Sequence, residues 1–437
     1  MTYVRIGGPV MLPPGPRLPA AAQTAWIMLD PAGAFDRLHR EYGPIFTVRY
    51  FGFPPEVYVT TAELAEQVYR TDQGGGLAGA ARRDFLEPMV GAHSVLTLDG
   101  DGWSRHRKAL TPPLRAKQVA GYHDEIAAIA AEKIATWPLG VPIALRDRMQ
   151  EITLEVIIRL VFGIRDAERL VRLHALLPRL IRLGGATSVV MLPARLRERA
   201  KGVPFLPYAR FLKARAGVDA ILYEEIARRR SAGADGTDVL SRLLESGFDD
   251  QEIRDELITL LIAGHETTAT SLAWAFERLL RLPHVLERLP DDEPYLDAVV
   301  KEVMRVRPAV YEAPRLLDAP LRLGEYEIPA GSYAGPFIPL VHRDPAAFPS
   351  PEEFRPERFL DGQQSRAWMP FGGGRRFCVG AQLALLEMRV IIREVLHRLD
   401  LTAPDPAPET RRLTNVTLSP ARLTRVIARA RSLDRTT

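Results

Sequence analysis

Apolar residues recur at helical spacing along most of this chain. From residue 62 onward they return every three or four positions, which is typical of helices that pack one face on a core. The longest predicted helix opens at Asp249, where Glu252 follows at capping-box spacing, and it stops at Pro283. Helices are expected over residues 103–112, 119–136, 149–162, 167–182, 207–230, 249–283 and 381–396, and a further helix ends at Pro308.

Strand-like runs are shorter and fewer. Residues 45–51 and 56–60 are separated by a Gly/Pro turn, as in a hairpin, and residues 311–338 have the pattern of short strands and turns. A glycine-rich stretch begins at Gly74 and leads into a segment that we expect to be irregular as far as about Gly102. Long loops of this kind in compact domains are often functional. The predicted fold class is therefore mainly α with a small β portion.

Composition narrows the class of protein. The 437 residues are 46% hydrophobic and 26% charged, which is typical of a globular protein, and no linker-like tract divides them, so we expect a single domain over residues 1–437. Residues 1–20 form an extended, proline-rich lead-in, since the prolines of Pro13–Pro19 fit neither a helix nor a central strand. The net charge of +4 comes from scattered arginines without an aromatic platform, which argues against nucleic acid as a partner.

Cysteine usage and the N-terminal sequence bear on the location of the protein. With one cysteine, Cys378, the chain forms no internal disulfide and no multi-cysteine zinc site, which favours a reducing cytoplasm. No signal-peptide pattern is present, and the apolar stretch 20–29 has about half the length of a membrane span. We therefore expect a cytoplasmic protein without a transmembrane anchor.

The strongest chemical signal is the segment Phe371–Gly380, with the sequence FGGGRRFCVG, followed by an apolar helix. Consecutive glycines let the backbone approach a flat group closely. A thiol at the start of a helix has a lowered pKa, and Arg376 supplies a cation for an anionic group nearby. A lone cysteine is usually a buried small apolar residue, but the glycines and arginines around Cys378 favour a reactive or metal-binding thiolate.

A second constellation lies in the middle of the long helix, at residues 263–268 with the sequence AGHETT. Gly264 makes an uncrowded point where a ligand can lie against the helix, and Glu266 with Thr267 can relay protons. A zinc-protease motif is excluded because residue 269, where it requires a second histidine, is alanine. A helix kink with threonine hydroxyls bonded to carbonyls of their own helix remains an alternative.

Two charge patterns are weaker by themselves. Glu302 and Arg305 are three residues apart on one helical face, a spacing that often gives only a surface ion pair. Trp103 and Arg107 are one helical turn apart and can reach the same target.

Together these segments resemble the cytochrome P450 family. Residues 371–380 match the family's haem-binding signature, Phe-Gly-x-Gly-x-Arg-x-Cys-x-Gly, at every fixed position, and residues 263–267 are similar to its oxygen-activation motif. The motifs follow the family's order from Pro13 to about Pro420. The resemblance implies the cytochrome P450 fold, a triangular prism with haem b between the long central helix and the helix after the cysteine loop. The proline-rich lead-in is typical of membrane-anchored members, although we expect no anchor in this protein.

The resemblance also implies roles for individual residues. Cys378 is the implied iron ligand, and Glu266 with Thr267 is the implied proton relay, while His265 fills a variable position without a catalytic role. The implied cofactor-binding residues are Cys378, Arg376, Trp103, Arg107, Arg315, Phe371, Gly372, Gly380, Ala263 and Gly264. The implied structural network is Glu302, Arg305 and Arg358. The expected substrate contacts are Val310, Tyr311, Val416 and Thr417, together with the loop between residues 82 and 98.

The expected activity is monooxygenation of a lipophilic small molecule such as a terpenoid, fatty acid, steroid or other secondary metabolite. A monomer is expected to bind O2 and to receive electrons from a ferredoxin or another separate donor, because no flavin or iron–sulfur module is present. A basic docking face is expected at Arg105, Lys108, Arg115 and Arg375. Peroxide-driven oxidation, isomerisation and oxidative coupling are alternatives, and a non-enzymatic haem sensor is a further one.

Overall fold

The computed structural model describes residues 12–184, 199, 203, 205–233, 236, 238–289, 292–362, 365–414 and 416–431. The chain forms two compact units, each built from separate stretches of sequence. Unit 1 comprises residues 1–81, 310–353 and 364–378, and unit 2 comprises residues 82–309, 354–363 and 379–437. The expectation of a single domain stays a prediction.

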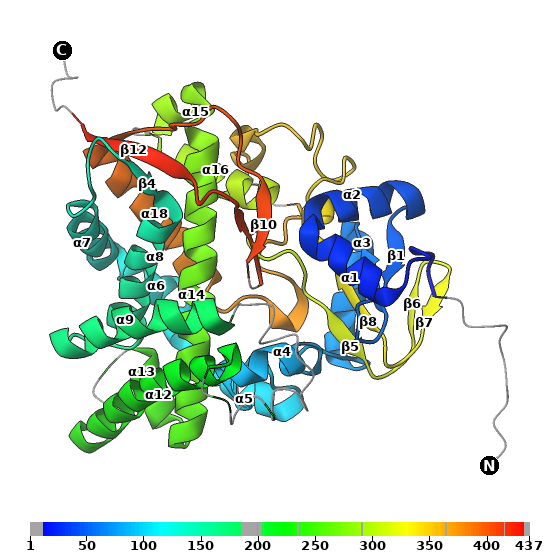
Figure 1. The fold of residues 1–437 in the computed structure, drawn as a ribbon, viewed down its shortest axis with the longest axis horizontal. Coiled ribbons are helices and arrows are strands. Elements are labelled where there is room, and N and C mark those ends of the chain that lie inside the picture. Colours follow the sequence, from blue (N-terminus) through cyan, green and yellow to red (C-terminus); the bar gives the residue numbers. More distant parts are fainter. Residues whose placement is uncertain are drawn as a thin grey trace. The chain divides into compact units, whose positions relative to one another are not determined.

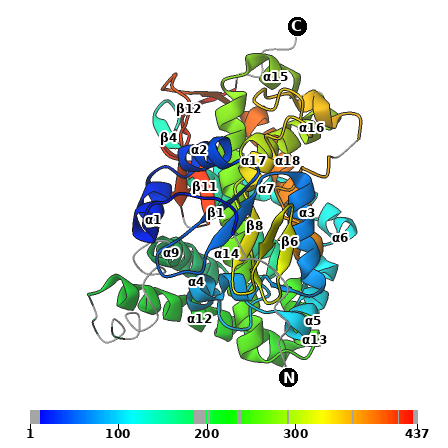
Figure 2. The ribbon, with the colours of Figure 1, turned by 90° about the vertical axis from the view of Figure 1, so that its right-hand side faces the viewer.

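Unit 1 is built around a small mixed sheet. Its five strands lie in the order β1-β2-β8-β5-β3, and only β2 and β8 run parallel. The strands are β1 (Ile45–Val48), β2 (Glu56–Val59), β3 (Gly76–Leu77), β5 (Arg315–Leu317) and β8 (Tyr333–Pro336), and β6 (Leu321–Leu323) and β7 (Tyr326–Ile328) form a separate hairpin. The helices are α1 (Ala20–Leu29), α2 (Pro31–Tyr42), α3 (Ala62–Arg70) and the short α17 (Ile338–Val341). Figure 2 shows α3 beside β6 and β8.

An aromatic cluster forms the core of unit 1. Phe35 of α2 stacks on Phe337 with ring centroids 3.9 Å apart, and it meets Tyr58 of β2 edge to face at 4.7 Å. Phe35 is positioned by the N-terminus of α2, which is well capped. The side chain of Asp30 accepts a hydrogen bond from the Gly33 amide, and Pro31 stands at the first helical position.

Unit 2 is predominantly helical. Its helices are α4 (Ala80–Val90), α5 (Gly100–Leu110), α6 (Ala116–Ala120), α7 (His123–Ile134), α8 (Leu145–Val156), α9 (Ala167–Gly184), α12 (Pro207–Ala232), α13 (Val239–Glu245), α14 (Asp250–Leu279), α15 (Pro283–Arg288), α16 (Glu293–Val306) and α18 (Ala381–Arg398). A π-helical turn, Ile157–Val161, continues α8. The strands β4 (Pro142–Ala144), β12 (Arg425–Ala430) and β9 (Leu399–Thr402) form an antiparallel sheet, and β10 (Arg411–Thr414) pairs with β11 (Thr417–Pro420).

The long helix α14 is the central element of unit 2 (Figure 1) and packs on α8, α12, α16 and α18. Its start is the predicted capping box: the Asp249 side chain accepts from the Glu252 amide at 2.8 Å, and the Glu252 side chain accepts from the Asp249 amide at 3.0 Å. The helix ends at Leu279, and Pro283 begins α15. Most of its side chains are buried, so it is surrounded by protein rather than lying on the surface.

The structure confirms the mainly α class and most predicted helices, with two differences. The segment expected to be irregular as far as Gly102 contains the helix α4, so that prediction was wrong for residues 80–90. The glycines at positions 74, 75 and 76 interrupt helical structure only before α4. The residues of α4 itself are mostly good helix formers. The helix predicted over residues 119–136 is interrupted at Gly121 and divides into α6 and α7.

In the part of the chain that the structure describes, no helix combines the length and the apolar composition that crossing a bilayer requires.

Candidate functional site

The loop that carries Cys378 belongs to unit 1, and glycines determine its shape. Gly372 and Gly374 have φ angles of +70° and +66°, which lie in the left-handed region that favours glycine. A Cβ atom on Gly373 would stand 2.5 Å from the Tyr69 ring, so a side chain there would displace α3 or the loop. Each of the three consecutive glycines is therefore required by the local geometry.

Backbone hydrogen bonds close this loop. The Cys378 amide donates to the Phe371 carbonyl at 3.0 Å, and the rings of Phe371 and Phe377 meet edge to face with centroids 6.0 Å apart. Upstream, the Met369 amide donates to Nε2 of the buried His342 at 2.9 Å. His342 thus holds the start of the loop by accepting a hydrogen bond from the backbone.

A buried ion pair ties the loop to the sheet of unit 1. Arg315 of β5 is fully buried, and its Nε and Nη2 lie 2.5 and 3.0 Å from the two carboxylate oxygens of Asp72. The same carboxylate accepts from the Arg375 amide at 3.1 Å. The guanidinium also donates to the carbonyls of Ala313 and Pro314.

Arg315 has a structural role that the sequence did not predict. It was predicted to bind a propionate, and in the structure it also pairs with Asp72, which holds the cysteine loop. A propionate contact by Arg315 stays a prediction. Sequence reasoning missed Asp72, because nothing in the segment before the glycines distinguishes it from a surface residue.

The groups that could hold an iron porphyrin on this side are a thiol and a cation. Cys378 is exposed and lies three residues before α18 begins, and Arg376 is half-buried in the same loop. A thiolate is an established axial ligand of haem iron, and a guanidinium suits a carboxylate such as a propionate. The chemistry of these donors therefore fits a haem.

In unit 2, α14 carries an accessible stripe within a buried helix. From Leu257 to Glu277 every residue is buried except four, and all four belong to the predicted oxygen-activation motif or directly precede it: Ile262, Ala263, Gly264 and Thr267. Ala263 and Thr267 are one turn apart and share a face. The structure thus leaves this face of α14 open at the point where the motif predicts contact with a ligand.

Thr267 makes the hydrogen bond that the alternative interpretation predicted. Its hydroxyl donates to the Ala263 carbonyl of its own helix at 2.6 Å. Back-bonding of this kind leaves the lone pairs of the hydroxyl oxygen available as acceptors toward the open face.

Gly264 is less open than expected. A Cβ atom at this position would stand 2.7 Å from Cδ1 of Ile157, in the π-helical turn that follows α8. The prediction of an uncrowded point was therefore wrong on this side of the helix. The glycine instead allows α14 and the π-helical turn to pack closely.

The acid of the motif is an ion-paired, buried carboxylate. Glu266 has 3% of its surface exposed, and its Oε1 lies 3.0 Å from Nη2 of Arg146 in α8. Arg146 also donates from Nε to the Thr270 hydroxyl at 3.3 Å. Arg146 was not predicted, because its sequence neighbourhood carries no recognisable signal.

His265 lies on the buried side of α14. Burial lowers its pKa to about 4, and its Nδ1 donates to the Leu261 carbonyl at 2.6 Å. It is therefore a neutral, hydrogen-bonded histidine at neutral pH. That it has no catalytic role stays a prediction.

The Glu-x-x-Arg pair forms the predicted buried network within unit 2. Glu302 and Arg305 are almost fully buried, with Arg305 Nε 2.7 Å from Oε2 and Nη2 2.8 Å from Oε1. Arg358 approaches Oε1 at 3.2 Å, and the Arg355 amide donates to the same oxygen at 2.8 Å. Burial lowers the pKa of Arg358, because desolvation disfavours its charged form. The network holds the chain segment 354–363 against α16.

Trp103 and Arg107 share one face of α5, as predicted, with Trp103 buried and Arg107 half-buried. Between them, His106 lies 2.7 Å from Oε1 of Glu256 on α14, and the Val95 amide donates to the same oxygen. Arg105 is engaged within unit 2, pairing with Glu252 at 2.6 Å. Its side chain stays about half exposed, so its place in a basic docking face stays a prediction.

The predicted substrate contacts differ in accessibility. Val310 and Tyr311 are half-buried, and Val416 is exposed at the turn of the β10–β11 hairpin. Thr417 is fully buried, and its hydroxyl donates to the Thr414 carbonyl at 2.9 Å, so it stabilises the turn instead of facing open space. The Trp274 indole donates to the Leu418 carbonyl and fixes this hairpin to α14.

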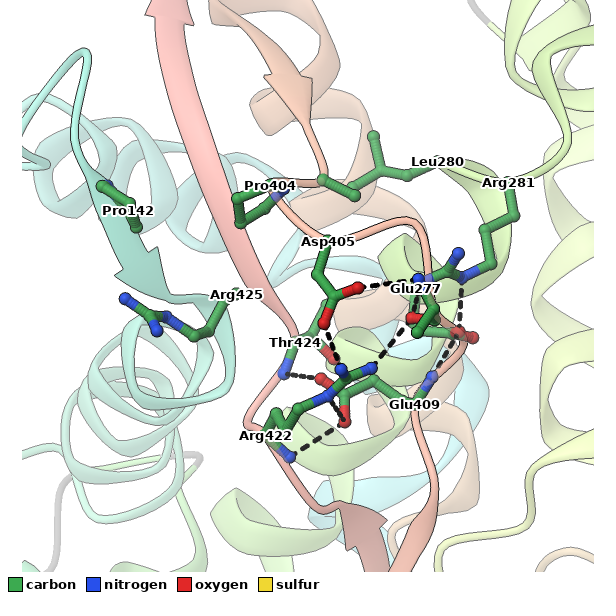
Figure 3. A pocket seen from close by; sticks show the side chains of 12 residues that line it. Pro142, Glu277, Leu280, Arg281, Pro404, Asp405, Glu409, Arg422, Thr424 and Arg425 are labelled. Atoms are coloured by element: carbon green, nitrogen blue, oxygen red, sulfur yellow. Dashed lines mark hydrogen bonds and ion pairs between the residues drawn. The ribbon is translucent and has the colours of Figure 1, made fainter.

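A separate hollow in unit 2 contains none of the predicted site residues (Figure 3). It measures about 270 Å³, and most of its charged side chains are paired: Arg281 with Glu277, and Arg422 with Asp405 and Glu409. Arg281 also donates to the Pro406 carbonyl, so this network joins the end of α14 to the C-terminal segment.

An accessible thiol on a glycine-shaped loop, an open stripe on a long buried helix and a buried Glu-x-x-Arg network are typical of haem-thiolate oxidoreductases. The family model described as Cytochrome P450 matches residues 13–427. The chain belongs to the cytochrome P450 family.

Its relatives support this assignment. The chain is 38% identical to "Putative cytochrome P450 135B1" of Mycobacterium bovis, over 96% of this chain and 92% of that protein. It is 36% identical to "Putative cytochrome P450 135A1" of Mycobacterium tuberculosis, over 94% and 93% respectively.

Solved structures agree on the fold. "Retinoic acid bound cyanobacterial CYP120A1" superposes with a TM-score of 0.84 at 23% identity, covering 97% of this chain and all of the other. "Crystal structure of cytochrome P450DA heme domain" gives 0.80 at 23% identity, covering 97% of this chain and 98% of the other. The protein is thus a cytochrome P450 monooxygenase that uses haem iron and O2 and receives electrons from a separate partner.

Proposed function

We propose that this chain binds haem b through the Cys378 thiolate and oxidises a lipophilic small molecule. One observation carries the proposal: the only cysteine of the chain is exposed at the end of a loop whose glycines, backbone hydrogen bonds and Asp72–Arg315 anchor fix its shape. A structural cysteine in a core would be buried.

When bound, a haem with a thiolate ligand supplies the activation of O2, since the thiolate donates electron density that favours O–O cleavage. The protein contributes binding and orientation. Arg376, Trp103 and Arg107 are proposed to donate to the propionates, and Phe371, Gly372 and Gly380 to surround the thiolate. Asp72 and Arg315 keep the loop in place.

We assign proton delivery to Thr267 and Glu266. Thr267 lies on the open face of α14 beside Ala263, where its hydroxyl can contact a ligand. Glu266 is buried next to it and is held by Arg146. In this arrangement Arg146 holds the ionised carboxylate. Glu266 would first take up a proton from the solvent and would then rotate away from Arg146 to pass that proton toward Thr267.

The substrate is proposed to be lipophilic, because Ala263, Val310 and Val416, which are predicted contacts and at least partly accessible, are apolar. A terpenoid, fatty acid, steroid or other secondary metabolite fits this description. The electron donor is proposed to be a ferredoxin that meets a monomer of this chain. The candidate contacts are the exposed basic residues Arg105, Lys108, Arg115 and Arg375.

The test of the iron ligand is spectroscopic. The ferrous carbonyl complex should show a thiolate-type Soret band, and Cys378→Ser should lose it while the neighbouring control Phe377→Leu keeps it. A thiolate-type band that persists in Cys378→Ser would disprove the assignment, because no other cysteine is present.

Peroxide-driven oxidation is the second candidate activity, since the Thr267 hydroxyl is bonded to its own helix. The two are separated by Thr267→Ala: O2-driven product formation should become uncoupled from oxygen consumption if Thr267 delivers protons, and peroxide-driven turnover should be unaffected. Isomerisation and oxidative coupling would be recognised by their products, and a sensor by the absence of any product.

A further inference from the structure

Unit 1 contains a cluster of two carboxyl groups and three phenols, which we call the acidic tyrosine cluster. Its members are Tyr50, Glu56, Tyr58, Tyr311 and Glu312. The Tyr58 hydroxyl donates to Oε2 of Glu312 at 2.7 Å and lies 3.0 Å from the Tyr50 hydroxyl. Glu56 and Tyr58 are two residues apart on β2, so they point to the same face of the strand.

One acceptor in this cluster lacks a donor. Glu56 has only 7% of its surface exposed, and among the described residues its Oε1 has no hydrogen-bond partner. A buried carboxyl oxygen without a donor is unfavourable, so the position suits an external group that carries N–H bonds or positive charge.

The electrostatics of the cluster favour a cation. Burial and the nearby Glu312 carboxylate raise the pKa of Glu56 well above its ordinary value, while hydrogen bonding from Tyr58 lowers it. For Tyr50, Tyr58 and Tyr311 as well, the charged groups that raise the pKa are the two glutamates. No positively charged side chain of the described residues is among the groups that shift these four pKa values. A cation between the carboxylates would offset their mutual repulsion.

The composition of the cluster favours an organic ammonium group over a metal ion. Tyr58 and Tyr311 pack on the aromatic core around Phe337, so aromatic rings border the carboxylates, and aromatic faces attract organic cations. Among the described residues, no group of three or more His, Cys, Asp or Glu side chains could hold a metal ion. Tyr50, Tyr311 and Glu312 are half-buried, so a ligand can reach the cluster from outside.

We propose that the acidic tyrosine cluster binds the ammonium group of an amine-bearing lipophilic substrate. This inference rests on the proposed function, because Tyr311 of the cluster and its neighbour Val310 are proposed substrate contacts. The substrate class then narrows from lipophilic molecules in general to long or polycyclic amines, with the nitrogen anchored between Glu56 and Glu312 and the hydrocarbon left for oxidation.

The experiment compares three probes of equal chain length on the haem-loaded protein. They are an alkyltrimethylammonium, its uncharged carbon isostere with a tert-butyl end, and the corresponding fatty carboxylate. A quaternary ammonium has no lone pair, so it cannot ligate iron. Binding is measured by calorimetry and by the spin-state shift of the Soret band. The variants are Glu56→Gln and Tyr58→Phe, with Glu63→Gln, an exposed glutamate on α3, as the control for net charge.

The ammonium probe should bind at least about tenfold more tightly than its isostere, since the attraction of an organic cation to a carboxylate and aromatic faces at a partly desolvated site is worth a factor of this order. The carboxylate should bind least. Glu56→Gln should abolish the preference, Tyr58→Phe should reduce it, and Glu63→Gln should leave it unchanged.

Equal affinity for ammonium and isostere, or a preference that survives Glu56→Gln, would overturn the inference. Potassium ions that bind in calorimetry while the ammonium probe does not would also overturn it and identify an inorganic cation site. The thiolate-type Soret band of each sample distinguishes failure of the proposed function from failure of this inference. If the wild-type protein lacks the band, the proposed function is refuted. If the band is present but ammonium is not preferred, only this inference is refuted. A Glu56→Gln protein that keeps the band is folded around its haem.

Discussion

At the scale of single residues, buried charges define the chemistry of this chain more than its exposed ones do. Glu266 with Arg146 and Asp72 with Arg315 are ion pairs whose side chains are buried beside proposed binding regions. Removing one member of such a pair leaves the other without a partner, so substitutions here test function and packing together.

Arg146 provides the first test at this scale. In Arg146→Met the buried Glu266 carboxyl would favour its neutral form and lose its fixed orientation. Because general acid–base groups contribute about 10²–10⁴-fold, product formed per O2 consumed should fall by roughly tenfold or more, and the pH profile of coupling should shift. Arg148→Met, which removes a partly exposed arginine of the same helix, should change neither. Unaltered coupling in Arg146→Met would remove Arg146 from the mechanism.

Glu387 on α18 provides a test by pH. It is almost fully buried, its Oε2 has no hydrogen-bond partner among the described residues, and burial raises its pKa well above the ordinary value. Since the folded state holds a proton that the unfolded state releases above its own pKa, the contribution of this group to stability is present at acidic pH and is lost as the pH rises. Glu387→Gln should therefore increase the melting temperature at neutral pH, and the gain should disappear near pH 4. A gain that is independent of pH would contradict this reasoning.

At the scale of elements, close packing against α14 decides which glycine is required. Gly264→Ala should cost about 1–3 kcal/mol, because the added methyl group meets Ile157 of the π-helical turn in a filled interior. The matched control is Gly102→Ala in α5, where a Cβ atom has ordinary contacts with Leu98 and where alanine should be neutral or stabilising by up to about 1 kcal/mol. Chemical denaturation of both variants measures the difference, and equal effects would show that helix propensity alone is responsible.

At the scale of the whole molecule, the chain passes repeatedly between its two units. One short segment that returns to unit 2 is held there by a buried network of charged side chains. Residues 354–363 belong to unit 2 although their neighbours on both sides belong to unit 1, and Glu302 binds Arg358 and the Arg355 amide within that segment. Glu302→Gln should destabilise the protein by about 3–5 kcal/mol, since Arg305 and Arg358 stay buried with less compensation. Glu293→Gln, an exposed residue of the same helix, should cost about 1 kcal/mol or less. Thermal unfolding and the haem content of the purified variants test this, and a small effect of Glu302→Gln would show that the network is dispensable.

Local patterns were sufficient for those features that neighbouring residues determine. The capping box at Asp249 and Glu252, the strands of the first hairpin and the helix after Cys378 depend on contacts within a few residues, so the sequence alone predicts them. The resemblance likewise predicted the buried network of Glu302, Arg305 and Arg358 and pointed to Thr267, whose face of α14 is open. The role of Cys378 stays a prediction.

Only the tertiary structure could decide which distant side chains meet. Asp72 and Arg315 are far apart in sequence, as are Arg146 and Glu266. The cluster that contains Glu56 and Glu312 likewise joins two separate stretches of sequence within unit 1. Such pairs leave no local signal, since their energy comes from desolvation and close approach in the folded chain. The same holds for Gly264, whose sequence context suggested open space while packing against Ile157 gives it a steric role. The sequence by itself determined the elements and the motifs; folding decided the burial and the partners that give each charged group its function.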